Sequence, residues 1–301
     1  FINLLIVFFL VKFPSAENLL QHISGANIDI LFVSRTEGIL RFRSLLSGPE
    51  GTGELLAVIS PLVLYKYFKS NKVLYLCYYS VFFISEIFTA TRSTIVLFVV
   101  GGLFGCLLCW RRKFSSIIKL VFAFFILASI MVMVKPNSLE GALYRFSLAR
   151  SAPNKIKDIP FVLNREIVWR EGLMGLKKAG FFGKGFLPPD VSAQVKVNFH
   201  NLFLTRIYQL GWVGSLPFFI IWLLIYFRLW KTQGQQKDAE IKILLQFFLL
   251  SLTILFINEM KYEFTRYPRC EYLYLFLFGM AYRLSRNLVV NSFVDNNNRG
   301  K

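Results

Sequence analysis

One histidine in the second half of the chain stands in a pattern that could support proton transfer. His200 is followed by Asn201, and after nine more residues come Gly211 and Gly214, which gives H-N-x9-G-x-x-G. A histidine titrates close to neutral pH and can take a proton from a hydroxyl group. The two glycines let a helix or a ligand approach the backbone closely. A histidine that only forms a hydrogen bond at a membrane interface is the alternative explanation.

Two arginines lie in polar segments between the apolar runs. Arg92 lies in the short polar segment TATRST between two apolar runs, and Arg165 lies in a long polar segment. Guanidinium groups stay protonated and can bind an anionic group in a bidentate manner. The chain has no Asp-x-Asp motif, which favours chemistry without a metal or other cofactor. Capping of a membrane span at the interface is the alternative role for Arg92.

The composition decides which kind of element must position these residues. Of the 301 residues 55% are hydrophobic and only 17% are charged, against about 25% charged in an average soluble domain. This excludes a soluble enzyme and a disordered chain, and four cysteines do not make a disulfide scaffold. We therefore expect an all-α, polytopic helical membrane protein, with residues 1–301 as a single membrane domain.

Apolar stretches that could cross a bilayer recur along the chain. They lie near 54–69, 73–90, 94–110, 117–134, 207–229, 243–260 and 272–284, and a partial span at 1–13 brings the number to eight. The chain begins with Phe1 inside an apolar run, so we expect that N-terminal spans are missing from the sequence.

Basic residues in the short loops predict the orientation of the spans. They gather around 66–72, 111–113, 228–242 and 283–301. These four sites alternate along the chain and are predicted to be cytoplasmic. The Thr89–Thr94 turn and the long loop 135–206 then lie on the opposite side.

The loop 135–206 carries twelve Lys or Arg and five Asp or Glu residues. A loop of this length is usually functional or disordered, and its charge favours an anionic lipid head group or a lipid-linked phosphate as partner. Residues 164–179 are predicted to form an amphipathic helix, with Arg165 and Trp169 on one face and Arg170 on another. A helix that only lies on the membrane interface is the alternative. The net charge of +18 is explained by loops and lipids, so we expect no nucleic acid.

Several stretches together resemble one family. NREIVWREGLMGLKKAGFFGKGF and VNFHNLFLTRIYQLGWVGSLPFF resemble the shared C-terminal region of bacterial O-antigen ligases and O-antigen polymerases. RFRSLLSGPEGTGELLAVISPLVL and TATRSTIVLFVVGG resemble the Arg-containing loop and the short turn that come earlier in the family. The resemblance covers roughly residues 35–285. The chain departs from the ligase pattern at Val96, and it has Gly48-Pro49-Glu50 where the family usually has Asn-Pro-Asn.

The resemblance implies a GT-C-like membrane glycosyltransferase of the bacterial inner membrane, with a partly helical periplasmic loop that carries active-site residues. The donor would be a glycan on undecaprenyl pyrophosphate, and no metal or nucleotide sugar would be needed. His200 would activate the acceptor hydroxyl, while Arg92 and Arg165 would bind the pyrophosphate. Substrate-binding roles are expected for Asn201 and Arg170, and for Arg41 or Arg43, which both fit the upstream arginine.

The sequence leaves the acceptor open. A polymerase adds the glycan to a second lipid-linked glycan, and a ligase adds it to the lipid A core. We favour a polymerase, because the ligase turn motif is incomplete and such polymerases are diverse in sequence. A transporter or flippase of an anionic lipid-linked solute predicts ionisable residues inside the spans, and Lys119 is the clearest one mid-chain. A non-catalytic envelope scaffold would not explain the Arg and His pattern.

Three further motifs are weaker. Cys106 and Cys109 fall inside a predicted span, where packing is expected rather than metal binding. Gly101 and Gly105 form a G-x-x-x-G contact pattern. Asn258-Glu259 ends a span on the predicted outer side, where Glu259 could form an ion pair or contact sugar; both remain open.

Overall fold

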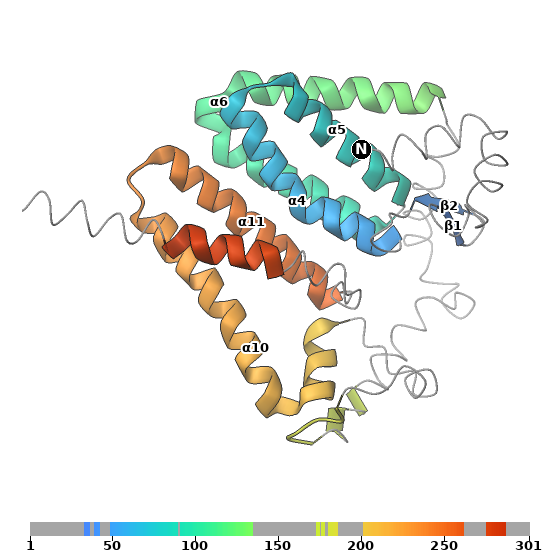
Figure 1. Cartoon of the computed structure of the whole chain (residues 1–301). Helices are drawn as coiled ribbons and strands as arrows, with labels where there is room; N and C mark the ends of the chain where they lie inside the picture. The colour runs from blue at the N-terminus through green and yellow to red at the C-terminus, as the bar shows by residue number, and fades with distance from the viewer. Residues whose placement is uncertain are drawn as a thin grey trace, which may run out of the picture. The chain divides into compact units, whose positions relative to one another are not determined.

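The computed structural model is helical throughout most of its described part (Figure 1). The described residues are 33–36, 39–42, 49–89, 91–134, 173–174, 176–177, 180–185, 201–261 and 275–286. They belong to two compact units. The first unit comprises Phe1–Ala149 and Gln246–Ile254, and the second comprises Arg150–Leu245 and Leu255–Lys301.

Five long helices account for most of the described residues. They are α4 (Pro49–Ser70), α5 (Val73–Thr89), α6 (Arg92–Val134), α10 (Leu202–Gln235) and α11 (Ala239–Lys261). A further helix covers 275–286. A short antiparallel pair, β1 (Val33–Thr36) and β2 (Ile39–Phe42), precedes them. The sequence did not predict these two strands.

Three helices are long and apolar enough to cross a membrane. They are Ser93–Ile126, Leu202–Gln235 and Ala239–Met260, and Val73–Thr89 is a shorter apolar helix. Their outer faces carry large exposed hydrophobic side chains such as Leu107 and Phe125, which suits contact with lipid. The prediction of a polytopic helical membrane protein is confirmed.

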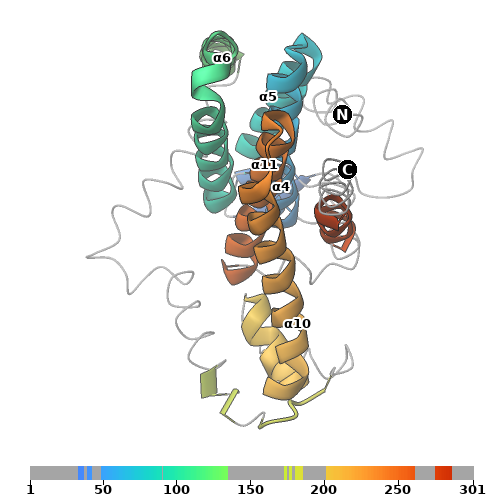
Figure 2. The ribbon, with the colours of Figure 1, turned by 90° about the vertical axis from the view of Figure 1, so that its left-hand side faces the viewer.

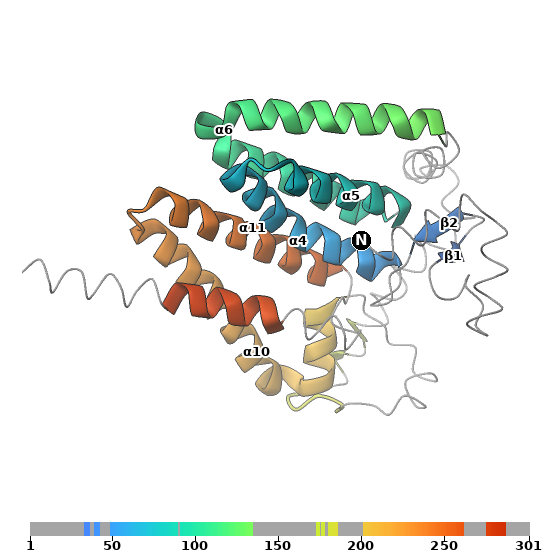
Figure 3. The same ribbon diagram turned by 45° about the horizontal axis from the view of Figure 1, so that its top comes forward.

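Helix α6 is broken at Lys113, where φ is −132° and ψ is 31°. Phe98 precedes the break and Phe124 follows it, yet both rings contact Tyr79 of α5, with centroids 5.0 and 5.6 Å away. A straight helix would place these two residues about 39 Å apart, so α6 must fold back on itself. Figure 3 shows the second part of α6 running back along α5. The predicted division into spans at 94–110 and 117–134 is therefore correct.

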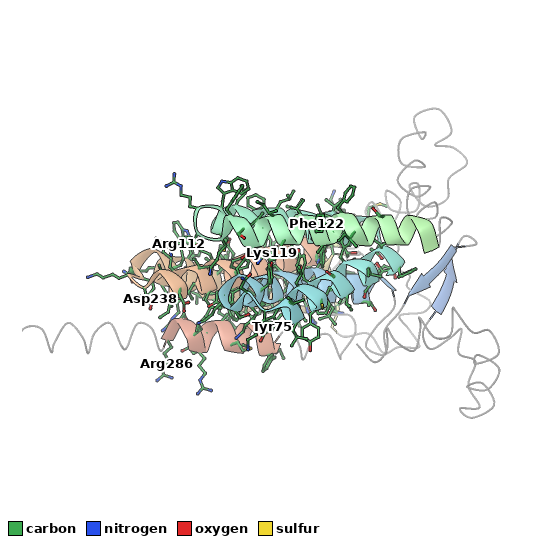
Figure 4. All side chains as sticks on the ribbon, turned by 90° about the horizontal axis from the view of Figure 1, so that it is seen from above. Tyr75, Arg112, Lys119, Phe122, Asp238 and Arg286 are labelled. Atoms are coloured by element: carbon green, nitrogen blue, oxygen red, sulfur yellow. The ribbon has the colours of Figure 1, made fainter. Side chains whose placement is uncertain are left out.

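The basic loops of the first unit meet at one end. The Tyr67 hydroxyl donates a hydrogen bond to the Ser116 carbonyl (3.1 Å), and the Ser116 hydroxyl donates to Oδ1 of Asn71 (3.1 Å). These bonds tie the α4–α5 loop to the break in α6. Arg112 is exposed beside the break (Figure 4). Two of the four loops that are predicted to be cytoplasmic thus lie at the same end of their unit. This is expected, because loops on one side of a membrane alternate along the chain with loops on the other side.

Small residues allow close helix packing in the first unit. A Cβ on Gly101 would lie 2.7 Å from Cδ1 of Ile254, and one on Gly105 would lie 2.8 Å from Cδ2 of Leu64 and 2.9 Å from Cε1 of Phe247. The G-x-x-x-G pattern therefore marks a true helix contact. Cys109 is buried in the same unit. Across the described residues, no group of three His, Cys, Asp or Glu side chains could hold a metal ion.

Aromatic rings hold the second unit together around Trp222 of α10. Its ring contacts Phe256 of α11 (5.7 Å between centroids) and Phe278 of the helix 275–286 (4.8 Å). The guanidinium of Arg228 lies over the ring of Tyr282, 5.0 Å from its centroid, which is a favourable cation–π distance. Figure 2 shows α10 and α11 from a second side.

Candidate functional site

Three of the predicted site residues lie in described elements. Arg92 is the first residue of α6, and Arg41 lies in β2 opposite Ser34; for both, only the backbone is described. Asn201, the N-cap of α10, is described in full. The predictions for the other four lie outside the described residues: Arg43, Arg165, Arg170 and His200.

A group of buried polar side chains surrounds the start of α6. We call it the threonine–glutamate cluster, and its members come from the first turns of α4, the last turn of α5 and the first turn of α6. They are at most 9% exposed: Thr52, Glu54, Glu86, Thr89, Thr91 and Thr94. Burial of so many polar groups in apolar helices is costly unless hydrogen bonds compensate.

Hydrogen bonds tie the cluster together. The Thr94 hydroxyl lies 3.0 Å from Oε2 of Glu86 and 3.0 Å from the Thr91 carbonyl. The Thr89 hydroxyl donates to the Glu86 carbonyl (2.8 Å) and accepts from the Thr91 amide (3.3 Å). The Glu86 carboxylate therefore lies at the N-terminus of α6, where the helix dipole stabilises negative charge.

A glycine makes room for the cluster. A Cβ on Gly53 would lie 2.5 Å from Oγ1 of Thr94 and 3.0 Å from Oε2 of Glu86. The first turn of α4 therefore packs its backbone directly against the polar side chains of α5 and α6. This contact holds the end of α5 against the start of α6, whose first residue is Arg92.

Two of the predicted arginines lie at one end of the first unit. The strand β2, which contains Arg41, contacts α5. Figures 1 and 3 show β2 beside the end of α5 from which the chain continues to α6. The backbones of Arg41 and Arg92 are thus placed at the same end, although 50 residues of sequence separate them.

In the second unit, Asn201 joins the start of α10 to the end of α11. Its Oδ1 accepts a hydrogen bond from the Leu204 amide (3.1 Å), and its Nδ2 donates to the Met260 carbonyl (2.7 Å). The first bond is a regular N-cap, and the second satisfies a carbonyl in the last turn of α11.

A glycine-rich turn packs on a break in α10. Gly211 has φ 69° and ψ −179°, which interrupts the helix, and Gly183 has φ 75°. A Cβ on Gly183 would collide with the backbone of Gly211, and a Cβ on Gly211 would collide with the Phe181 carbonyl. The sequence predicted a close approach at Gly211, and the approaching group is this backbone turn. The span predicted at 207–229 is therefore not one continuous helix.

The turn supplies the hydrogen bonds that the broken helix loses. The amides of Lys184 and Gly185 donate to the carbonyls of Tyr208 (2.8 Å) and Gln209 (2.9 Å), and the Val213 amide donates to the Phe181 carbonyl (3.4 Å). In a continuous helix the Val213 amide would pair with the Gln209 carbonyl. In or near a membrane the freed backbone groups need such partners, so residues 180–185 are part of the fold of α10.

Sequence reasoning missed the threonine–glutamate cluster. Glu86 lies within the apolar run of α5, and an ionisable residue inside a span is a signal for function that could have identified it. Glu54 gives a weaker signal in the sequence, because it lies at the start of an apolar run and not inside one.

Residues 77–219 match the family model described as O-antigen ligase. No curated protein and no solved structure matches the chain. The matched segment contains most of α5, all of α6, the docked turn, Asn201 and the break in α10. It also contains Arg92, Arg165 and His200, while Arg41 lies outside it. Over this segment, a little less than half of the chain, the protein is similar to the O-antigen ligase family.

Proposed function

We propose that the protein is a membrane glycosyltransferase of cell-surface polysaccharide assembly that transfers a glycan from undecaprenyl pyrophosphate to a sugar hydroxyl. The observation that carries the proposal is the O-antigen ligase match, because one segment includes all three residues proposed for catalysis. We place the reaction on the periplasmic side of the bacterial inner membrane, where the predicted orientation puts the start of α6 and the loop 135–206.

His200 acts on the acceptor in this proposal. It accepts the proton of the acceptor hydroxyl as the oxygen forms a bond to the anomeric carbon of the donor sugar. The bond from that carbon to the pyrophosphate oxygen breaks, and the electron pair leaves with the lipid pyrophosphate. The junction of Asn201 with Met260 holds the backbone next to His200 in place, and we assign Asn201 a role in substrate binding.

Arg92 and Arg165 act on the donor. They neutralise the charge that develops on the leaving pyrophosphate, so no metal ion is required. Support for Arg92 comes from its place at the N-terminus of α6, a position that favours anions. Arg41 or Arg43, together with Arg170, completes the phosphate-binding set, and the contact of β2 with α5 supports Arg41.

We favour a polymerase over a ligase. The test uses the full-length protein in liposomes with an undecaprenyl-pyrophosphate-linked oligosaccharide and a chelator of divalent metals. A ladder of longer lipid-linked glycans that is lost in His200→Ala and in Arg165→Ala supports the polymerase. Products that form only after addition of lipid A core identify a ligase. Normal transfer by a His200→Ala, Arg165→Ala double variant would overturn the proposed roles.

A further inference from the structure

Asn258 of α11 is buried without a hydrogen-bond partner. Its side chain is 0% exposed, and neither Oδ1 nor Nδ2 has a partner among the residues that the structure describes. A buried amide that can accept and donate is normally paired, because an unpaired one loses its hydration without compensation. The neighbouring Glu259 is equally buried. A polar group kept in this state indicates a function other than helix packing.

Asn258 lies next to the start of α10. The bond from Nδ2 of Asn201 to the Met260 carbonyl (2.7 Å) fixes the N-terminus of α10 against the last turn of α11. Asn258 is two residues before Met260, within the same helical turn. Figures 1 and 2 both show the end of α11 beside the start of α10.

The electrostatics of this end of α11 favour a neutral ligand. The last carbonyls of a helix carry partial negative charge, and Glu259 adds a carboxyl group at the same end. The N-terminus of α10 offers the opposite polarity, but the side chain of Asn201 already accepts from its Leu204 amide. The partial negative charge of the helix end disfavours a pyrophosphate, whereas sugar hydroxyls can both donate to and accept from a carboxamide.

We propose that Asn258 binds a sugar hydroxyl of the glycan, one helical turn from the Asn201 junction. The inference rests on the proposed function, because it names the part of the substrate that this end of the second unit recognises. Since Asn258 is fully covered, the glycan reaches it only when neighbouring side chains move aside. Asn258 is therefore a sugar-binding residue, separate from the arginines that bind pyrophosphate.

The test compares two ligands in binding to the full-length protein, with no need for turnover. One ligand is an undecaprenyl-pyrophosphate-linked oligosaccharide, and the other is undecaprenyl pyrophosphate without sugar. In Asn258→Leu we expect the glycan-bearing lipid to bind about tenfold more weakly or worse, because a substrate hydroxyl loses its partners. Binding of undecaprenyl pyrophosphate alone should stay unchanged.

Thermal unfolding separates this role from a structural one. Leucine has a similar size and no polar atoms, so Asn258→Leu should unfold at the same or a higher temperature if the amide has no partner in the fold. Thr253→Val is the matched control, because it removes a polar group of α11 whose hydroxyl donates to the Leu249 carbonyl within the helix (2.8 Å). It should leave the binding of both lipids unchanged.

Each outcome has a definite meaning. Weaker binding of both lipids, unchanged binding of both, or a clear loss of stability in Asn258→Leu would overturn the proposal. If the wild-type protein binds the glycan-bearing lipid more tightly than the bare lipid but forms no product, the proposed function fails. The ratio of the two binding affinities in Asn258→Leu still decides the role of Asn258. Equal binding of the two lipids by the wild-type protein would exclude sugar recognition altogether.

Discussion

The threonine–glutamate cluster of the first unit and the end of α11 in the second unit differ in how their buried polar side chains are paired. In the threonine–glutamate cluster of the first unit, the hydroxyls of Thr89, Thr91 and Thr94 all contact acceptors within the cluster. At the end of α11 in the second unit, Asn201 is bonded on both sides, while Asn258 has no partner in the described chain. Both places lie at helix ends that the sequence predicts to face the same side of the membrane.

The difference divides buried polar residues of apolar helices into two kinds, those that stabilise the fold and those that are available for binding. A cluster whose members bond to each other fixes the backbone, here the start of α6 with Arg92. A buried amide without a partner does not strengthen the fold, and this favours a role in binding. Substitutions that separate stability from ligand binding can therefore break or sharpen the comparison.

The largest effect is expected at Gly211. In Gly211→Ala the new Cβ meets the Phe181 carbonyl, so the turn 180–185 must leave the break in α10 and its three backbone hydrogen bonds are lost. We expect a loss of about 3 kcal/mol or more in unfolding free energy. Thermal unfolding measures it, and trypsin should cleave faster after the exposed Lys184.

Gly180→Ala is the control for this experiment. Gly180 has the same φ of 69°, but a Cβ there has no atom within 4 Å. Gly180→Ala should therefore lower the unfolding free energy only by the backbone strain of about 1–2 kcal/mol. Equal losses in the two variants would show that the turn does not stabilise the break.

The next effect is expected at Asn201. Asn201→Asp keeps an oxygen for the Leu204 amide but turns a donor to the Met260 carbonyl into an acceptor. We expect the unfolding free energy to fall by about 1–3 kcal/mol, which thermal unfolding measures. Asn201→Ser, which also retains the N-cap oxygen but places no carboxylate near the carbonyl, should lose less. If both variants unfold like the wild type, the junction does not hold α10 against α11.

A smaller effect is expected at Gly53. The Cβ in Gly53→Ala would lie 2.5 Å from Oγ1 of Thr94, so the cluster must shift. Overpacking of this kind lowers the unfolding free energy by about 1–3 kcal/mol. The better helix propensity of alanine offsets up to about 1 kcal/mol of that loss. We expect a net loss in thermal unfolding and a higher KM for the lipid-linked donor, because the start of α6 moves. An unchanged KM would show that the cluster does not affect donor binding.

The smallest effect is a gain at Gly234. This glycine lies in the last turns of α10, and a Cβ there has no atom within 4 Å. Gly234→Ala should therefore stabilise the protein by about 0.5–1 kcal/mol through helix propensity alone. It serves as the helical Gly→Ala control for Gly53, and a loss of stability would contradict the open surroundings of Gly234.

The sequence by itself predicted the helical membrane class and the division of α6, because both depend on local composition. Apolar runs of bilayer length and the basic residues 111–113 are enough to predict two spans and the turn between them. The family resemblance also comes from the order of local motifs, and the matched segment 77–219 confirms it. The roles of His200, Arg92 and Arg165 stay predictions from those motifs.

Only the tertiary structure decided which distant residues meet. The docking of 180–185 on Gly211, the bond from Asn201 to Met260 and the assembly of Gly53 with Glu86 and Thr94 all join segments that are remote in sequence. No periodicity encodes such contacts, since they depend on how helices cross and on where a missing Cβ allows two backbones to approach. Burial of Asn258 without a partner is likewise a property of the packed helices, because the same residue in sequence could as easily face water.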